Sequence, residues 1–311
     1  VHLDQVTYRI IADSTTRFNN LRSGDVEVLE RTAPTDVAAL ESDPNLQLIT
    51  SESLGYQGIT INVGNANGIT EPPGPLSDDL ASPVSESNVV RQALELSLDR
   101  EAINQAVFVG QFSPACGPIS PASPLSSDAA QTCTEHDPAA AQALLEQAGV
   151  ETPVQLDLMI GTDAQARRLG EAVQAQASEG GFDIQLNPTE FSSALDLADL
   201  GDFQMFAIGW SGRVDPDGNI ASFLTTQAPL NTAGYSNPEA DRLIEAARAS
   251  SDVTERQQLY GELHAVVRPD APLIYLYRQK NLTGVVNTVA GVEVFGDGLV
   301  RLANAGFVAD E

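Results

Sequence analysis

Lysine is almost absent from this 311-residue sequence: Lys280 is the only one. All basic residues together number 16 against 43 acidic ones, which gives a formal net charge of −27 at pH 7. A chain of that charge is repelled by phosphate backbones and by anionic membrane surfaces, so the composition argues against nucleic-acid binding. Long apolar runs are missing as well. No stretch approaches the roughly 18 residues of a membrane helix, and no signal peptide is recognisable.

The rest of the composition is that of a folded protein. Apolar residues make up 42% and charged residues 19%, values typical of folded soluble chains rather than disordered ones. The length suffices for two hydrophobic cores. The sequence opens at Val1 in the middle of a pattern and without an initiator methionine, which suggests a processed or truncated piece.

The usual parts of catalytic and metal sites are sparse. The three histidines lie in different regions, and none belongs to an H-E-x-x-H or His–Cys arrangement. Ser211 lies in a Gly-Trp-Ser-Gly segment that approaches a hydrolase nucleophile motif, but Arg213 stands where that motif needs glycine. The segment 215–219 spaces its oxygens like the start of a calcium loop, yet its twelfth position is Thr226 rather than glutamate. Because Gly-rich phosphate and dinucleotide motifs are also missing, the sequence predicts a binding protein with no catalytic residues, metal or cofactor.

Two cysteines, Cys116 and Cys133, lie 17 residues apart in a loop of about residues 110–136 that is rich in Pro, Ser and Ala. Their placement predicts an oxidising compartment and one disulfide that closes a surface loop with few core residues. A bond across a loop of this length stabilises the fold by roughly 3 kcal/mol. The alternative is two unpaired cysteines in a reducing cytoplasm, since a metal site would need two more ligands.

Strands and helices alternate along much of the chain. The clearest run predicts strand, helix, strand, helix and strand at 154–160, 164–178, 182–187, 192–199 and 203–208, an α/β signature. Cap residues followed by proline predict helices at 137–149 and 237–249, and a further helix at 253–267 is stopped by Pro269. Near the start, Val6 to Ile11 has the β-rich pattern of a strand. Two apolar segments, 55–62 and 273–278, suit strands that cross between lobes.

Several further segments are weak one by one but specific in their order and spacing. They are Leu3–Asp13, Asn20–Val26, Gly55-Tyr56 with Ile61-Asn62, Val90–Leu94, Leu98–Ile103, Ala140–Gly149, Gly209-Trp210 with Asp215–Asp217, Tyr235–Pro238 and Ala271–Tyr275. Together they cover nearly the whole chain. In this combination the sequence resembles the extracellular solute-binding proteins of family 5, the peptide-type receptors of ABC importers.

The resemblance implies an α/β, periplasmic-binding-protein-like (type II) two-lobed fold, with the second lobe complete and the first lobe partial. Residues 1–54 would be the C-terminal part of lobe I, 55–276 would form lobe II, and 277–311 would return into lobe I. The N-terminal part of lobe I would be lacking. The resemblance also implies a monomeric protein of the periplasm or cell surface that is not an enzyme and needs no cofactor. Such a protein binds an oligopeptide or peptide-like small organic ligand in an interlobe cleft and delivers it to ABC transporter permease subunits.

In peptide-binding members of that family, the Gly-Trp segment lines the cleft and its backbone pairs with the ligand as an added strand. The corresponding ligand-binding candidates here are Tyr56, Ile208, Gly209, Trp210, Ser211, Gly212, Arg213 and Asp215. Members that hold a peptide ammonium usually carry Asp three residues after the Trp. Arg213 stands there in this sequence, which argues against a free peptide N-terminus and predicts an anionic group on the ligand.

Alternatives stay open at three of these residues and for the function. Trp210 either lines the cleft or belongs to the core, and Tyr56 either faces the cleft or packs at the hinge. Arg213 either binds ligand or braces its loop through Asp215 or Asp217. Two other functions fit the sequence. One is a sensor module that presents its liganded form to a membrane receptor, and the other is a hydrolase that uses the serine after Trp210.

Overall fold

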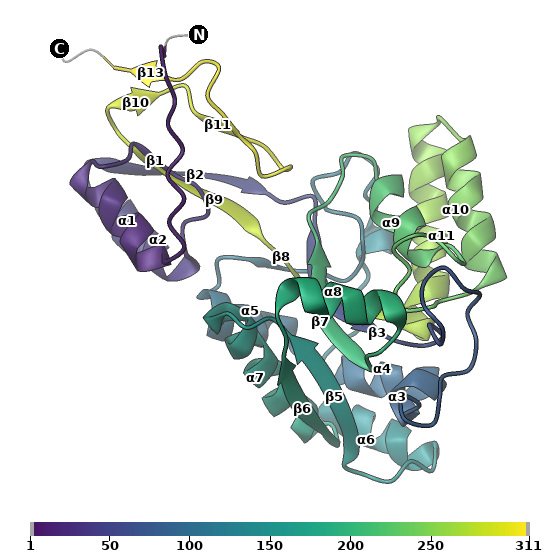
Figure 1. The fold of residues 1–311 in the computed structure, drawn as a ribbon. Helices are drawn as coiled ribbons and strands as arrows, with labels where there is room; N and C mark the ends of the chain where they lie inside the picture. The colour runs from purple at the N-terminus through teal and green to yellow at the C-terminus, as the bar shows by residue number, and fades with distance from the viewer. Residues whose placement is uncertain (1–2, 309–311) are drawn as a thin grey trace. The chain divides into compact units, whose positions relative to one another are not determined.

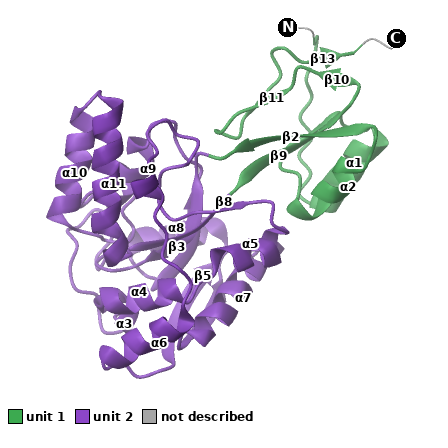
Figure 2. Cartoon of the chain, turned by 180° about the vertical axis from the view of Figure 1, so that it is seen from behind, with its two compact units in different colours: residues 1–53, 279–311 green, residues 54–278 purple. Residues whose placement is uncertain are grey.

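The computed structural model describes residues 3–308, which divide into two compact units (Figure 2). Unit 1 combines two separate stretches of chain, residues 1–53 and 279–311, and unit 2 is the continuous segment Leu54–Arg278. Unit 2 is therefore inserted into the sequence of unit 1. The assignment of the two units to a partial first lobe and a complete second lobe stays a proposal.

Unit 1 is built on a three-stranded antiparallel sheet in which β9 lies between β1 and β2. Its elements are α1 (Ser14–Ser23), β1 (Val28–Leu29), a 3-10 turn (Pro34–Asp36), α2 (Val37–Glu41), β2 (Leu46–Glu52) and β9 (Lys280–Val286). Leu21 and Leu40 pack in the core of this unit. Gly284 on β9 permits that packing, because a Cβ atom there would lie 2.7 Å from Leu21 Cδ2 and 2.6 Å from Leu40 Cδ1.

The remaining parts of unit 1 are small or irregular. Two short antiparallel pairs complete it, β10 (Val289–Ala290) with β13 (Gly306–Phe307) and β11 (Glu293–Val294) with β12 (Val300–Arg301). The predicted strand over residues 6–11 is wrong, since this segment pairs with no strand in the described part of the chain. Its alternating apolar side chains stay exposed, from 44% for Val6 to 100% for Ile10. The pattern suits a strand, but no neighbouring strand is present to bind its backbone.

Unit 2 contains a six-stranded mixed sheet in the order β4-β8-β3-β7-β5-β6 (Figure 1). The strands are β3 (Tyr56–Ile61), β4 (Ser113–Pro114), β5 (Val154–Ile160), β6 (Phe182–Pro188), β7 (Met205–Trp210) and β8 (Leu273–Arg278). Strand β5 is parallel to β6 and β7, and the other pairs are antiparallel. The predicted strand–helix alternation over 154–208 is confirmed as β5, α7, β6, α8 and β7.

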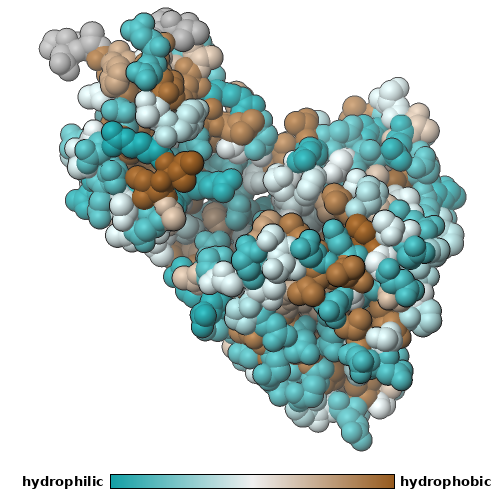
Figure 3. Space-filling model, in the orientation of Figure 1, coloured by the Kyte–Doolittle hydropathy of each residue, from teal (hydrophilic) through white to brown (hydrophobic). Residues whose placement is uncertain are grey.

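Helices surround this sheet. They are α3 (Pro83–Glu86), α4 (Asn88–Leu96), α5 (Arg100–Phe108), a 3-10 turn (Asp128–Gln131), α6 (Pro138–Gln147), α7 (Ala164–Glu179), α8 (Phe191–Leu200), α9 (Asp217–Leu224), α10 (Pro238–Ala249) and α11 (Val253–Asp270). The predicted caps of α6 and α10 are present, since the side chains of Asp137 and Asn237 accept hydrogen bonds from first-turn amides. None of the helices in residues 3–308 has the length and apolarity to cross a membrane. The face of unit 2 in Figure 3 is largely hydrophilic, with apolar side chains in separate patches.

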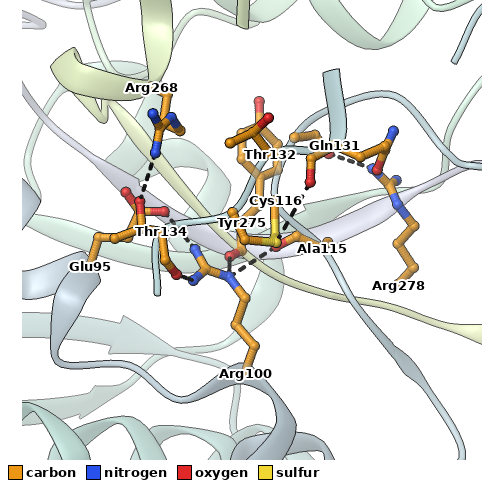
Figure 4. The surroundings of a disulfide bond; sticks show 12 residues. Glu95, Arg100, Ala115, Cys116, Gln131, Thr132, Thr134, Arg268, Tyr275 and Arg278 are labelled. Atoms are coloured by element: carbon orange, nitrogen blue, oxygen red, sulfur yellow. Dashed lines mark hydrogen bonds and ion pairs between the residues drawn. A yellow bond between two sulfur atoms is a disulfide. The ribbon is translucent and has the colours of Figure 1, made fainter. Parts of the chain in front are cut away.

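The cysteine-bearing loop is closed by a disulfide and also packs against the hydrophobic core of unit 2. Cys116 and Cys133 form a disulfide with their Cα atoms 5.0 Å apart (Figure 4). The expectation of a loop with few core residues is wrong. Ile119, Leu125 and Ala130 are buried in the hydrophobic cluster formed with α9, α10 and α11. Buried Arg278, which lies outside the loop, also donates to the loop's carbonyls at Gly117 and Ile119.

Candidate functional site

The C-terminal four residues of β7, 207–210, form an open strand edge. Strand β3 pairs with β7 along its whole length, from Met205 to Trp210. On the other side, β5 pairs only with Met205 and Phe206. The backbone of residues 207–210 therefore has no strand partner on that side within the described part of unit 2. An open edge of this kind can accept an extended chain through main-chain hydrogen bonds.

The chain then turns at Gly212, which no other residue could replace without strain. Its φ of +86° lies in the left-handed region. A Cβ atom at this position would lie 2.3 Å from the carbonyl carbon of Leu54. The turn is thus fixed against the start of β3, and it leaves the side chains of Ser211 and Arg213 exposed.

Trp210 is half-buried and contacts both the core and the surface. Its ring meets Phe223 of α9 edge-on, with centroids 5.0 Å apart. The guanidinium carbon of Arg213 lies 4.3 Å from the indole centroid, a cation–π contact. The indole Nε1–H donates to Asn219 Oδ1 at 3.0 Å. One part of the ring therefore packs inward while its face supports an exposed cation, and the contact of Trp210 with a ligand stays a prediction.

Asp215 and Asp217 do not brace Arg213. Asp215 forms an ion pair with Arg256 of α11 at 2.6 Å, and Asp217 forms one with Arg248 of α10 at 3.2 Å. The hydrogen bond from Arg256 also lowers the pKa of the Asp215 carboxyl. The alternative in which Arg213 braces its loop through Asp215 or Asp217 is wrong, because these two carboxylates are paired with arginines of more distant helices. Asp215 thereby joins its loop to α11, and its contact with a ligand stays a prediction.

Tyr56 belongs to the core. It is only 2% exposed and lies in a cluster with Ala115 and Tyr275. Its ring centroid is 4.9 Å from that of Tyr275 and 6.4 Å from that of Phe223. The predicted ligand contact of Tyr56 is thus not available at the surface of unit 2. A large ring beside the close-packed Gly55 and Gly58 gains more from burial than from exposure.

Asn219 contributes to the site in a way that was not predicted from the sequence. Residues 215–219 are spaced like the start of a calcium loop in the sequence, and in the structure α9 begins among them, at Asp217. In addition, the buried side chain of Asn219 holds the Ser211–Arg213 turn. Its Oδ1 accepts the Arg213 backbone N–H at 2.6 Å, and its Nδ2 donates to the Arg213 carbonyl at 3.1 Å. The only sequence signal was a polar residue on the first turn of an apolar helix.

Groups for hydrolysis or metal binding do not gather at this site. Residues 3–308 contain no cluster of three or more His, Cys, Asp or Glu side chains arranged to hold a metal ion. Ser211 Oγ accepts a hydrogen bond from Arg213 Nη1 at 3.3 Å. An arginine stays protonated at neutral pH and does not act as the general base that a serine nucleophile requires. The arrangement can bind through backbone, indole and guanidinium groups.

Known proteins share this sequence pattern and fold. The family model described as bacterial extracellular solute-binding proteins, family 5 middle, matches residues 1–231. The dipeptide-binding protein of Escherichia coli K12 is 28% identical over 94% of this chain and 53% of its own length. The glutathione-binding protein GsiB of Pectobacterium atrosepticum is 26% identical over 97% of this chain and 57% of its own length.

A solved structure extends the comparison to the fold. The ABC transporter substrate-binding protein CtaP of Listeria monocytogenes superposes with a TM-score of 0.81 at 21% identity, over 96% of this chain and 59% of its own. The chain thus spans somewhat more than half the length of the relatives it matches.

Proposed function

This chain belongs to the bacterial extracellular solute-binding proteins of family 5, and from that membership we propose that it captures an oligopeptide or peptide-like small organic ligand for an ABC importer. The predicted family and the type II periplasmic-binding-protein fold are confirmed, with the chain covering part of that fold. The relatives named for a dipeptide and for glutathione support a peptide-like ligand. We further propose that the protein works outside the cytoplasm as a monomer, delivers its ligand to permease subunits, and performs no catalysis.

The observation that carries this proposal is the open edge of β7. Residues 207–210 offer main-chain donors and acceptors beside β3, where an extended peptide can add as a strand. Main-chain pairing tolerates many side chains, which suits a receptor for peptides of varied sequence. Each hydrogen bond of this type contributes about 0.5–1.5 kcal/mol, so a few of them support useful affinity when the edge is already in place.

Two measurements test the proposal. Native mass spectrometry of the freshly purified chain should show a co-purified small molecule that leaves on denaturation. Amide hydrogen exchange should then show that trialanine protects residues 207–213, whereas trialanine methylated on its amide nitrogens does not. Equal protection by both peptides would contradict pairing at this edge. The absence of a retained ligand, together with no protection by either peptide, would contradict the binding function itself.

The importer role needs a cellular test. Deletion of the gene should abolish uptake of the retained ligand, and a plasmid copy should restore it. Unchanged uptake, with loss of a transcriptional response to the ligand, would instead indicate the sensor module.

A further inference from the structure

The turn after β7 carries a cation that no acidic side chain neutralises. Arg213 is exposed, and among residues 3–308 no carboxylate lies within ion-pair distance of its guanidinium. The aspartates at 215 and 217 are engaged by other arginines. The sequence has 43 acidic and only 16 basic residues, so acidic partners are plentiful. An exposed arginine that nevertheless lacks one is available to a ligand.

The guanidinium is held in place by groups that leave its binding side open. It lies over the Trp210 ring, and its Nη1 donates to the Gly212 carbonyl at 2.7 Å and to Ser211 Oγ at 3.3 Å. Within the described residues, Nε and Nη2 have no hydrogen-bond partner. These two nitrogens form one side of the planar fork and match the spacing of two carboxylate oxygens.

Asn219 fixes this arrangement from below. It is 2% exposed and bonds the backbone N–H and carbonyl of Arg213 as well as the indole N–H of Trp210. The buried amide of Asn219 therefore fixes the position of the Arg213 main chain and that of the Trp210 ring beneath the guanidinium. A cation held before the ligand arrives loses little conformational entropy on binding.

We propose that Arg213 binds a carboxylate of the ligand through Nε and Nη2, and that Asn219 is its positioning residue. The inference rests on the proposed function, because the open edge of β7 and Arg213 follow each other along one segment. The ligand class is then a peptide-like molecule with an anionic group. A cation here also offsets the −27 background that otherwise repels anions.

Four peptide probes and one simple acid separate the possibilities. The first probe, N-acetyl-trialanine, carries only a carboxylate. The second, N-acetyl-trialanine amide, carries no charge, and the third, trialanine amide, carries only an ammonium. N-acetyl-Ala-Glu-Ala amide moves the carboxylate to a side chain, and glutarate lacks peptide bonds. The readouts are affinity by calorimetry and the indole N–H signal in NMR, which is unambiguous because Trp210 is the only tryptophan.

N-acetyl-trialanine or N-acetyl-Ala-Glu-Ala amide should bind at least about tenfold more tightly than the uncharged amide. The tighter of the two shows whether the bound carboxylate is that of the C-terminus or that of a side chain. Arg213→Gln should remove this preference. Arg168→Gln is the matched control, because Arg168 is an exposed arginine of α7 without an ion pair in the described residues, and it should keep the preference. Asn219→Ala should reduce the ratio of acid to amide affinity, whereas a merely structural role would weaken both probes equally.

The outcomes separate this inference from the proposed function. Equal binding of the acids and the amide, unchanged by Arg213→Gln, would overturn the anion site and leave peptide binding intact. A glutarate-induced shift of the indole signal that depends on Arg213, without binding of any peptide probe, would support the anion site and contradict peptide binding. No shift and no binding with any probe would overturn both.

Discussion

Two buried tyrosines of unit 2 differ in what their hydroxyl groups contact. The Tyr235 hydroxyl donates to Asp270 Oδ2 at 2.7 Å. The Tyr56 hydroxyl is buried and has no hydrogen-bond partner among residues 3–308. Burial raises the pKa of Tyr56 well above its usual value, so its hydroxyl remains a neutral donor. An unsatisfied buried donor costs free energy, whereas a satisfied one does not.

The first prediction contrasts these two residues. Tyr56→Phe should leave the free energy of unfolding unchanged or raise it by up to about 2 kcal/mol, because it removes a hydroxyl without a partner. Tyr235→Phe should lower it by about 1–2 kcal/mol, because Asp270 Oδ2 then keeps only the hydrogen bond that it accepts from Asn237. Urea unfolding followed by circular dichroism measures both. A loss for Tyr56→Phe as large as that for Tyr235→Phe would show that the Tyr56 hydroxyl is bonded after all.

For single residues, the sequence predicted which residues belong to the candidate site better than it predicted their burial and contacts. The Ile208–Arg213 segment was found from its motif, because a Gly-Trp pair at that spacing is distinctive. The burial of Tyr56 was not predictable, since an aromatic residue between glycines suits a ligand wall and a core equally well. The role of Asn219 was missed because it depends on how a turn folds back on α9.

At the scale of elements, the cysteine-bearing loop is attached by buried side chains as well as by its disulfide. Arg278 is 1% exposed and donates to the carbonyls of Gly117 and Ile119. Arg100 donates to the Ala115 carbonyl at 3.1 Å, and His264 Nε2–H donates to the Thr132 carbonyl at 2.8 Å. The disulfide is therefore one of several anchors of this loop (Figure 4).

Loss of the disulfide should accordingly destabilise unit 2 without releasing the loop. In a Cys116→Ser/Cys133→Ser double variant, the free energy of unfolding should fall by up to roughly 3 kcal/mol, as expected for loss of a loop constraint. Hydrogen exchange at 117–132 should stay slow under native conditions, because the side-chain anchors persist. Exchange in that loop as fast as in the exposed segment 5–13 would contradict this picture.

The pH dependence of the same loop should depend on His264. Burial lowers the pKa of His264, while its hydrogen bond to Thr132, the charge of Arg268 and that of Glu95 act as smaller influences. The unfolded chain then binds a proton more readily than the folded one, so stability is lost as pH falls below about 6.5 toward the folded pKa. His264→Gln should flatten the stability profile between about pH 7.5 and 5. A variant profile parallel to that of the parent would refute the assignment.

The elements themselves were predicted where local signals were strong. The alternation from β5 to β7 and the proline-capped α6 and α10 follow directly from periodicity and capping residues. The strand expected at residues 6–11 failed because strand formation requires a partner, which a local pattern does not specify. The burial of Ile119 and Leu125 was not predicted, because the surrounding Pro, Ser and Ala residues are typical of a surface loop.

For the whole molecule, the two units should differ in resistance to proteolysis. Unit 2 has a six-stranded sheet with surrounding helices, whereas unit 1 has a three-stranded sheet and an exposed segment at 5–13. Thermolysin, which cleaves at apolar residues and so does not depend on the scarce lysines, should cut first near Val6 and Ile10. A fragment close to 54–278 should persist, as mass spectrometry of the digest would show. Uniform resistance of the whole chain would contradict this expectation.

The insertion of unit 2 within unit 1 has a consequence for the order of events during synthesis. Strand β2 is made before unit 2, but its partner β9 is made after it, since Leu46 pairs with Val286 and Glu52 with Lys280. At about 5–20 residues per second, a ribosome adds the intervening chain in roughly ten seconds to a minute. Throughout that interval β2 lacks its partner strand, whereas unit 2 receives its last residue, Arg278, before β9 is made. Unit 1 is therefore the first unit whose synthesis begins and the last whose sheet can form completely.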